Sequence, residues 1–271
     1  MIAHRPGPAE AALYREQGFL LPIQALPEDE ALAIAAWIDA LPKDRLTALE
    51  VPWVQKSYLL FPTLDAVIRN GAILDCVEAL FGPDILVLSA DLFIKPPHNG
   101  QRITWHQDVN YWGLEPMEVV TAWVALTEAT PENGCMRFSP GGHLRALPHI
   151  ESYAADNMLS RGQEIAVEID ERSTVYGALR PGQASLHHGL MPHASGPNQT
   201  DRPRIGFAIR YAPTKVRQTS GPPITAMLVR GEDRYGHFRL EHPAQGDLDV
   251  AAIAAHRAAL LPHAAERFST I

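Results

Sequence analysis

The chain has 271 residues, of which 46% are hydrophobic and 20% charged, as in an ordinary globular protein. Its formal net charge of −8 argues against a nucleic-acid partner, because nucleic-acid-binding surfaces are basic. No apolar run approaches the ~20 residues of a membrane span, and residues 1–10 lack the apolar core of a secretory signal. The two cysteines provide no disulfide framework, so we expect a cytoplasmic protein with no membrane partner.

Helix-forming stretches dominate the chain up to about residue 84. Residues 9–17 have helix-forming composition and stop at Gly18, which can cap a helix in the left-handed conformation. Residues 28–41 carry a broad apolar band, and Pro42 ends the expected helix. Residues 64–81 are expected to form one or two further helices.

From Ile85 the pattern changes to short runs rich in β-branched and aromatic residues, separated by turn residues. These runs cover residues 85–88, 91–95, 103–112, 119–126, 136–139, 164–169, 184–188 and 204–211. Many short strands favour a sandwich or barrel over a parallel α/β sheet. Residues 247–261 are rich in alanine and predict a closing helix. We expect one domain over 1–271, with a helical part at about 1–84, a strand core at about 85–212 and a tail with a helix at 213–271.

The motif Trp105-His106-Gln107-Asp108 is the most informative in the chain. Alternate side chains of a strand share a face, so His106 and Asp108 are expected to point the same way. The flanking residues are apolar, and burying an imidazole and a carboxylate among them is costly unless something pairs with them. A metal ion is one sufficient partner, because one further histidine would complete a 2-His-1-carboxylate triad for non-haem Fe(II). A satisfied hydrogen bond in the core is the alternative.

Three histidines compete to be the third ligand of such a triad. His187 and His188 are neighbours in an expected strand, so they face opposite ways and one of them can point towards the site. His193 has a serine, Ser195, two residues on and therefore on the same strand face, ahead of a turn.

The strand expected at 204–211 has one apolar face and one face of small residues and arginines. Arg204 and Arg210 lie on the second face, where a guanidinium fork could bind a carboxylate. A surface ion pair is the alternative reading of Arg204.

These motifs resemble, in order and spacing, the phytanoyl-CoA dioxygenase (PhyH) family of Fe(II)/2-oxoglutarate-dependent oxygenases, from about residue 18 to residue 211. The resemblance rests on FIKPP at 93–97, WHQD at 105–108, AWVAL at 122–126, ENGCM at 132–136, PGGH at 140–143, HASGPN at 193–198 and RPR at 202–204. It implies a mainly β fold with flanking helices and a double-stranded β-helix core, which is a cupin-like jelly roll. It also assigns Fe(II) to His106, Asp108 and His193.

The same resemblance assigns the distal carboxylate of the cosubstrate 2-oxoglutarate to Arg204 and Ser195, with Trp123 lining that pocket. Lys56 resembles an N-terminal lysine that reaches the active site in some members. The implied reaction uses O2, releases succinate and CO2, and oxidises an aliphatic C–H of a small metabolite or natural-product intermediate. Halogenating relatives have a small residue in place of the carboxylate, so Asp108 favours a hydroxylase.

A fatty acyl-CoA would need clustered basic residues for its phosphates, and no such cluster stands out. The residues suspected of contacting a smaller substrate are Asn110, Tyr111, Trp112, Met136, Arg137, Phe138 and Arg210. For each aromatic residue, core packing is the alternative. A cupin-like metalloprotein without O2 chemistry, such as an isomerase or a ligand-binding or sensor protein, also stays open, as does a catalytically silent member acting as a sensor or interaction module. We expect a monomer or a homodimer.

Residues 143–180 show little regular pattern beyond the strand expected at 164–169, which is unusual for a segment of this length. We expect part of 144–161 to cover the mouth of the active site as a lid. A variable surface loop is the alternative interpretation.

Overall fold

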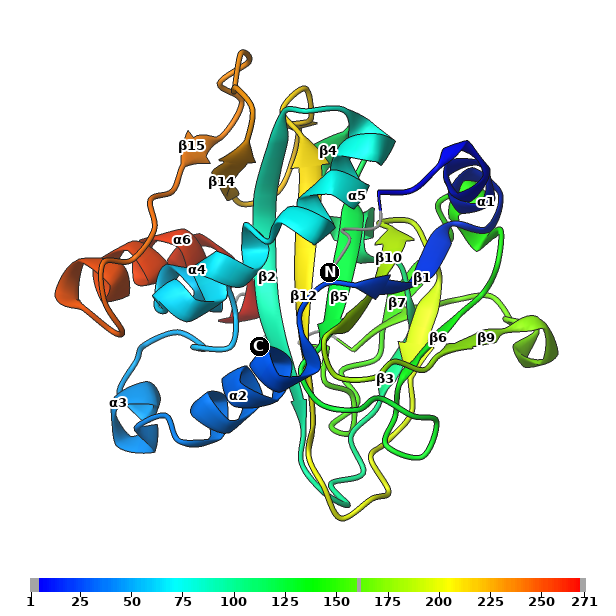
Figure 1. The fold of residues 1–271 in the computed structure, drawn as a ribbon, viewed down its shortest axis with the longest axis horizontal. Helices are drawn as coiled ribbons and strands as arrows, with labels where there is room; N and C mark the ends of the chain where they lie inside the picture. Colours follow the sequence, from blue (N-terminus) through cyan, green and yellow to red (C-terminus); the bar gives the residue numbers. More distant parts are fainter. Residues whose placement is uncertain (1–4, 160–161, 269–271) are drawn as a thin grey trace.

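The computed structural model describes residues 5–159 and 162–268. Two sheets form its centre, and helices cover the outer face of the larger sheet (Figure 1). The strands of the larger sheet are, in spatial order, β1 (Phe19–Gln24), β10 (Gln183–His188), β5 (Val120–Ala125), β12 (Arg204–Pro213), β2 (Ile85–Lys95), β14 (Thr225–Arg230) and β15 (Arg239–Leu240). Neighbouring strands are antiparallel except for β14 and β15.

The smaller sheet is antiparallel, in the order β3 (Ile103–His106), β11 (His193–Ser195), β6 (Met136–Phe138) and β9 (Val175–Gly177). Two short ribbons pair β4 (Leu114–Glu115) with β13 (Arg217–Gln218) and β7 (His149–Glu151) with β8 (Gln163–Ile165). This arrangement confirms the predicted fold class, a mainly β protein with flanking helices and a jelly-roll core.

The α-helices are α1 (Pro8–Gln17), α2 (Glu28–Asp39), α3 (Lys43–Thr47), α4 (Pro62–Ile68), α5 (Gly71–Phe81) and α6 (Val250–Phe268). Short 3-10 helices are η1 (Ser57–Leu59), η2 (Asp108–Tyr111), η3 (Gly142–Leu144) and η4 (Glu171–Ser173). The predicted stretch at 64–81 is divided at Asn70, whose side chain caps α5 by accepting a hydrogen bond from the Ile73 amide. No helix in the described part of the chain is long and apolar enough to span a membrane.

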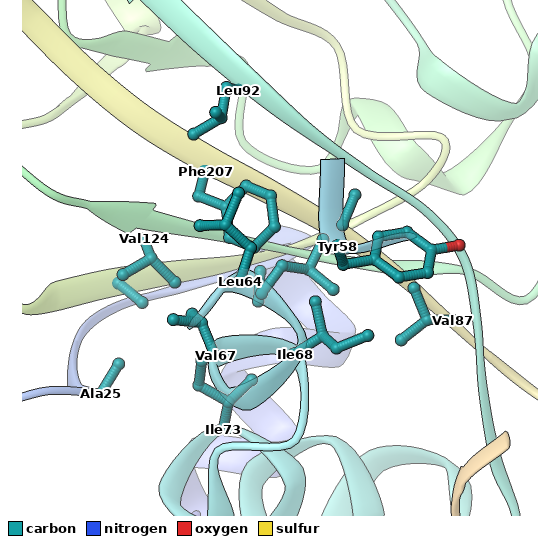
Figure 2. Close-up of a cluster of buried hydrophobic side chains, with 14 of the residues drawn as sticks. Ala25, Tyr58, Leu64, Val67, Ile68, Ile73, Val87, Leu92, Val124 and Phe207 are labelled. Carbon is teal, nitrogen blue, oxygen red and sulfur yellow. The ribbon is translucent and has the colours of Figure 1, made fainter. Parts of the chain in front are cut away.

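The main hydrophobic core lies between the helices and the larger sheet (Figure 2). Leu64 of α4 and Ile73 of α5 pack there with Val124 of β5 and Phe207 of β12, and all four are fully buried. Burying a side chain of this size contributes about 1.5–3 kcal/mol. This packing supports the sheet from behind and leaves its other face for the site.

Strand β12 shows most clearly how the sequence pattern positions the site. Residues 205, 207, 209 and 211 point into the core under the helices, and residues 204, 208 and 210 line a cavity on the opposite face. The predicted division of this strand into an apolar face and a face of arginines and small residues is therefore observed.

The structure differs from the sequence-based expectation in several places. The strand predicted at 164–169 ends at Ile165, and β7 and β9 lie in the segment 143–180, where no other strand was predicted. Strand β1 lies inside the region predicted to be helical, and β14 extends the larger sheet from the region predicted to be a tail. The strand predicted at 103–112 ends at His106, and η2 follows it. In each case tertiary pairing, which a local pattern does not contain, decides the conformation.

Candidate metal centre and cosubstrate pocket

The structure brings His106, Asp108 and His193 together. One possible ligand atom from each lies within 4.8 Å of the other two. Asp108 Oδ1 lies 3.4 Å from His106 Nε2 and 3.9 Å from His193 Nε2. His106 and His193 are directly opposite each other across β3 and β11, so strand pairing places the two imidazoles side by side. Two imidazoles and one carboxylate form the donor set of a non-haem iron site.

His106 and Asp108 converge for a different reason from the one predicted. The two residues do not lie on one continuous strand, because Asp108 is the first residue of η2. Gln107 between them keeps an extended backbone, with φ −119° and ψ 128°, so both side chains still reach the same point. The Gln107 amide side chain fixes this turn by donating to the carbonyls of Arg145 and Leu190, at 2.9 and 2.6 Å.

Both histidines are held with one ring nitrogen free for a metal. His106 Nδ1 lies 2.9 Å from the Thr104 carbonyl, and His193 Nδ1 lies 2.9 Å from the Met191 carbonyl. A carbonyl can only accept, so each Nδ1 carries the proton and each Nε2 keeps a lone pair facing Asp108. Burial holds the pKa of His193 well below its usual range, which keeps this imidazole neutral and able to bind a cation.

The Asp108 carboxylate is oriented by two donors on its second oxygen. Thr121 Oγ1 donates to Oδ2 at 2.9 Å, and Arg210 Nε lies 3.4 Å from the same atom. Burial alone would raise the Asp108 pKa, but the charge of Arg210 holds it well below the usual range. Asp108 is therefore a buried anion whose Oδ1 is directed at the two histidines.

The competition among the three histidines is resolved by position. His188 turns away, because its Nδ1 accepts from the Leu190 amide at 3.0 Å and its ring packs against His143. His187 lines the cavity, with its ring centroid 4.7 Å from that of His193, but its nitrogens are not among the converging ligand atoms. Burial lowers the pKa of His187 to about 4, so it is a neutral wall of the site.

Next to the triad, Arg204 points into the cavity without an anionic partner among the described residues. Its side chain is 1% exposed, and both Nε and Nη2 have no hydrogen-bond partner there. The guanidinium lies 5.1 Å from the centroid of the Trp123 indole, and Ser195 lines the same cavity. Gly206 makes this possible, because a Cβ at that position would collide with the indole. A buried cation with two unused donors fits a carboxylate.

Lys56 is not brought to this cavity. Its amine lies 2.6 Å from Glu241 Oε1 and 2.8 Å from the carbonyl of Thr225, in a buried ion pair. Lys95 lies beside the pocket instead, with its amine in contact with Ser195 and Gly196. The FIKPP motif contains Lys95, but its register opposite Arg204 appears only once the strands are paired.

A second cavity, of about 240 Å³, is lined by two members of the triad, His106 and Asp108. Trp112 and Arg210 line it, as predicted for substrate contacts, and Asp91, which the sequence analysis did not identify, lines it too. Arg210 is bound there by Asp91, with Nη1 and Oδ2 2.5 Å apart. Met158, Leu159 and Gln163 form another part of the wall of this second cavity.

The other predicted substrate residues take different positions. Met136 lines the first cavity, the one that contains Arg204 and the triad. Phe138 is fully buried and stacked on Phe19. Arg137 points to the other face of β6 and binds Glu171. Asn110 lines neither cavity, and the Tyr111 side chain lies outside the described part of the structure.

Comparisons with known proteins agree with this geometry. A curated relative, a probable alpha-ketoglutarate-dependent hypophosphite dioxygenase from Stutzerimonas stutzeri, is 28% identical over 163 residues, covering 59% of this chain and 56% of that protein. The ectoine dioxygenase of Streptomyces avermitilis is 25% identical over 255 residues, covering 84% of this chain and 86% of that protein. A solved structure of the non-heme monooxygenase ThoJ has a TM-score of 0.81 and 39% identity, covering 95% of this chain and 96% of that one.

The chain thus spans little more than half of the first of these relatives but nearly all of ThoJ. The family model for phytanoyl-CoA dioxygenase (PhyH) matches residues 14–206, which include the three converging ligands and Arg204. The chain therefore belongs to the phytanoyl-CoA dioxygenase family of Fe(II)/2-oxoglutarate-dependent oxygenases.

Proposed function

We propose that the protein is an Fe(II)- and 2-oxoglutarate-dependent dioxygenase that hydroxylates an aliphatic C–H of a small molecule and releases succinate and CO2. One observation carries this proposal: a buried cation with unused donors, Arg204, lies in the same cavity as the His106, Asp108 and His193 triad. A triad alone fits many metalloproteins, whereas the added carboxylate-binding group fits a dicarboxylate cosubstrate.

Different residues of the site would bind the metal, bind the cosubstrate and orient the carboxylate ligand. His106, Asp108 and His193 would hold Fe(II), which, with 2-oxoglutarate bound, supplies the O2-dependent oxidation. Arg204 and Ser195 would bind the far carboxylate of the cosubstrate, against the Trp123 indole. Thr121 and Arg210 keep Asp108 Oδ2 engaged, so the carboxylate presents Oδ1 to the metal.

The second cavity favours an uncharged substrate of modest size. Arg210 is the one cationic side chain among the described residues that line it, and Asp91 and Asp108 already balance its charge. An anionic group such as a phosphonate or the phosphates of acyl-CoA would find no free cation among those residues. A volume of about 240 Å³ suits a small metabolite better than a coenzyme A conjugate.

Hydroxylation is favoured over halogenation because Asp108 supplies a carboxylate where halogenating relatives have a small residue. A cupin-like metalloprotein without O2 chemistry is the alternative class. Arg204 argues against it, since such a protein has no need of a buried, unpaired guanidinium beside its metal.

Cosubstrate turnover tests the proposed function directly. With Fe(II), 2-oxoglutarate and O2, the protein is expected to form succinate at a rate that increases when the correct substrate is added. Candidate substrates should be small uncharged molecules that enzymes encoded by neighbouring genes make or consume. A phosphonate and an acyl-CoA serve as comparisons. Absence of both 2-oxoglutarate binding and succinate formation from metal-loaded protein would overturn the proposal.

A second prediction concerns the segment 144–161, whose described residues end at 159. Met158 and Leu159 form part of the wall of the second cavity, and Asn157 Nδ2 donates to Thr104 Oγ1 at 2.7 Å. Leu144 and Tyr153 are 75% and 57% exposed, so a protease can reach the segment. We expect cleavage in 144–161 to slow when 2-oxoglutarate, substrate and an inert metal are all bound, because closure would order the wall. Equal cleavage with and without these ligands would make it an ordinary surface loop.

A further inference from the structure

We propose that Lys95 is a second cationic group of the cosubstrate pocket, which takes up a proton when a dicarboxylate binds beside Arg204. The proposal rests on the proposed function, because it concerns the binding of 2-oxoglutarate. Lys95 acts through Ser195 and through its charge, as a positioning residue behind the cavity wall.

Strand pairing places two cations next to each other in the protein interior. Lys95 of β2 is directly opposite Arg204 of β12, and the two side chains are 0% and 1% exposed. Like charges in such a pair repel each other, and burial strengthens the repulsion. Neither has a carboxylate partner among the described residues. Two buried positive charges without a counter-ion favour the arrival of an anion.

The Lys95 amine is built into the wall that Ser195 forms. It donates to the Ser195 carbonyl at 3.3 Å, to the Ser195 hydroxyl and to the Gly196 carbonyl. The Ser195 hydroxyl donates in turn to the Gly134 carbonyl at 2.9 Å, so it acts as an acceptor towards Lys95. Three acceptors suit the three donors of a protonated amine. These acceptors can therefore hold the charged form of Lys95, while the one proton of the Ser195 hydroxyl would turn from Gly134 to a bound carboxylate.

The surroundings make the charge of Lys95 sensitive to a bound anion. Burial, followed by the charge of Arg204, lowers the pKa of Lys95 to about 7. The other titratable group facing it is Cys135, whose thiol stays protonated because burial raises its pKa to about 11. Ser195 of β11 and Gly196 just after it contact the amine and carry no titratable side chain, and Asp91, on the same face of β2, is paired with Arg210.

The sign of the effect follows from linkage. A bound dicarboxylate raises the pKa of Lys95, so affinity is greatest below the pKa of the free protein and falls as pH increases above it. With a free-state pKa of about 7, binding takes up about 0.1 proton at pH 6 and about 0.9 at pH 8. The Kd for 2-oxoglutarate rises about tenfold between these two pH values. Both carboxyl groups of 2-oxoglutarate are ionised throughout, because ordinary carboxyl pKa values lie near about 4.

Calorimetric titration of the full-length, Mn(II)-loaded protein with 2-oxoglutarate measures this uptake, in buffers that differ in ionisation enthalpy. The wild type is expected to show the uptake at pH 8 and nearly none at pH 6. Lys95→Met is expected to show no uptake at either pH and a Kd independent of pH. Lys56→Met is the matched control, because it removes another buried lysine, and it should keep the wild-type uptake.

Three outcomes would overturn the proposal: a wild-type protein that binds without proton uptake at pH 8, uptake that persists in Lys95→Met, or uptake that is lost in Lys56→Met. The first needs no variant, so it applies even if Lys95→Met fails to fold. Failure of the proposed function is a different result, in which the wild type does not bind 2-oxoglutarate at any pH.

Discussion

Replacing Asp108 with alanine is expected to abolish hydroxylation and to weaken Fe(II) binding by more than about 100-fold. Loss of a group that merely orients a ligand typically costs 10–100-fold, and Asp108 is itself one of the three converging ligands. The change also removes the one anion among them, so only the two imidazoles of the triad remain to hold the cation. Metal titration of the stripped protein and product analysis under O2 measure the two effects.

His188→Ala is the matched control for Asp108→Ala. His188 is adjacent to a cavity-lining histidine in the sequence but packs against His143, so its loss should leave metal binding unchanged. Full activity in Asp108→Ala together with an inactive His188→Ala would show that the ligand assignment is wrong. Chloride in the product of the native protein would contradict the preference for hydroxylation.

The part of the site that repeats with a period of two residues could be predicted from the sequence. Alternation in 204–211 predicts that Arg204 and Arg210 share a face, and the structure places both on the cavity wall. The same argument placed Ser195 with His193, and both line the cavity. A periodic pattern works here because β11 and β12 keep one face turned to the site, although the pairing of each strand shifts register, between His193 and Ser195 in β11 and between Arg210 and Tyr211 in β12.

The rule that alternate residues of a strand share a face gave the correct position for Asp108, although Asp108 does not lie in the strand. Asp108 converges with His106 although the strand has already ended, because the extended Gln107 preserves the direction of the next side chain. The hydrogen bonds of Gln107 to Arg145 and Leu190 come from distant segments. A local pattern contains no information about such contacts.

The two buried lysines show what the sequence could not decide. Lys56 and Lys95 are both almost fully buried, and each has polar neighbours that satisfy its amine. Which of them lies at the cosubstrate pocket depends on the partners, Glu241 for one and Ser195 for the other. These partners are separated by 185 and 100 residues along the chain, so only the fold identifies them.

Replacing Arg204 with leucine is expected to raise the KM for 2-oxoglutarate at least about tenfold while leaving the affinity for Fe(II) unchanged. A hydrogen-bonded pair with a charged partner contributes about 1.5–3 kcal/mol, and about 1.4 kcal/mol corresponds to tenfold. Arg204→Lys should not restore the wild-type KM, since an ammonium cannot reproduce the guanidinium fork. Steady-state kinetics in 2-oxoglutarate, at saturating Fe(II), measures these values.

Thermal unfolding separates this binding role from a structural one. Arg204 is buried without an anionic partner among the described residues, so its loss removes an unfavourable desolvated charge from the metal-bound protein. Arg204→Leu is therefore expected to have a Tm at least equal to that of the wild type without cosubstrate, but to lose the increase in Tm that 2-oxoglutarate produces in the wild type. Arg202→Ala, at an exposed position two residues away, should keep that increase.

If Arg204→Leu retained both the wild-type KM and the full increase in Tm, the carboxylate would have to bind elsewhere. Arg210 lines the same cavity, but Asp91 and Asp108 already engage it, so Lys95 would then be the remaining cation beside the pocket.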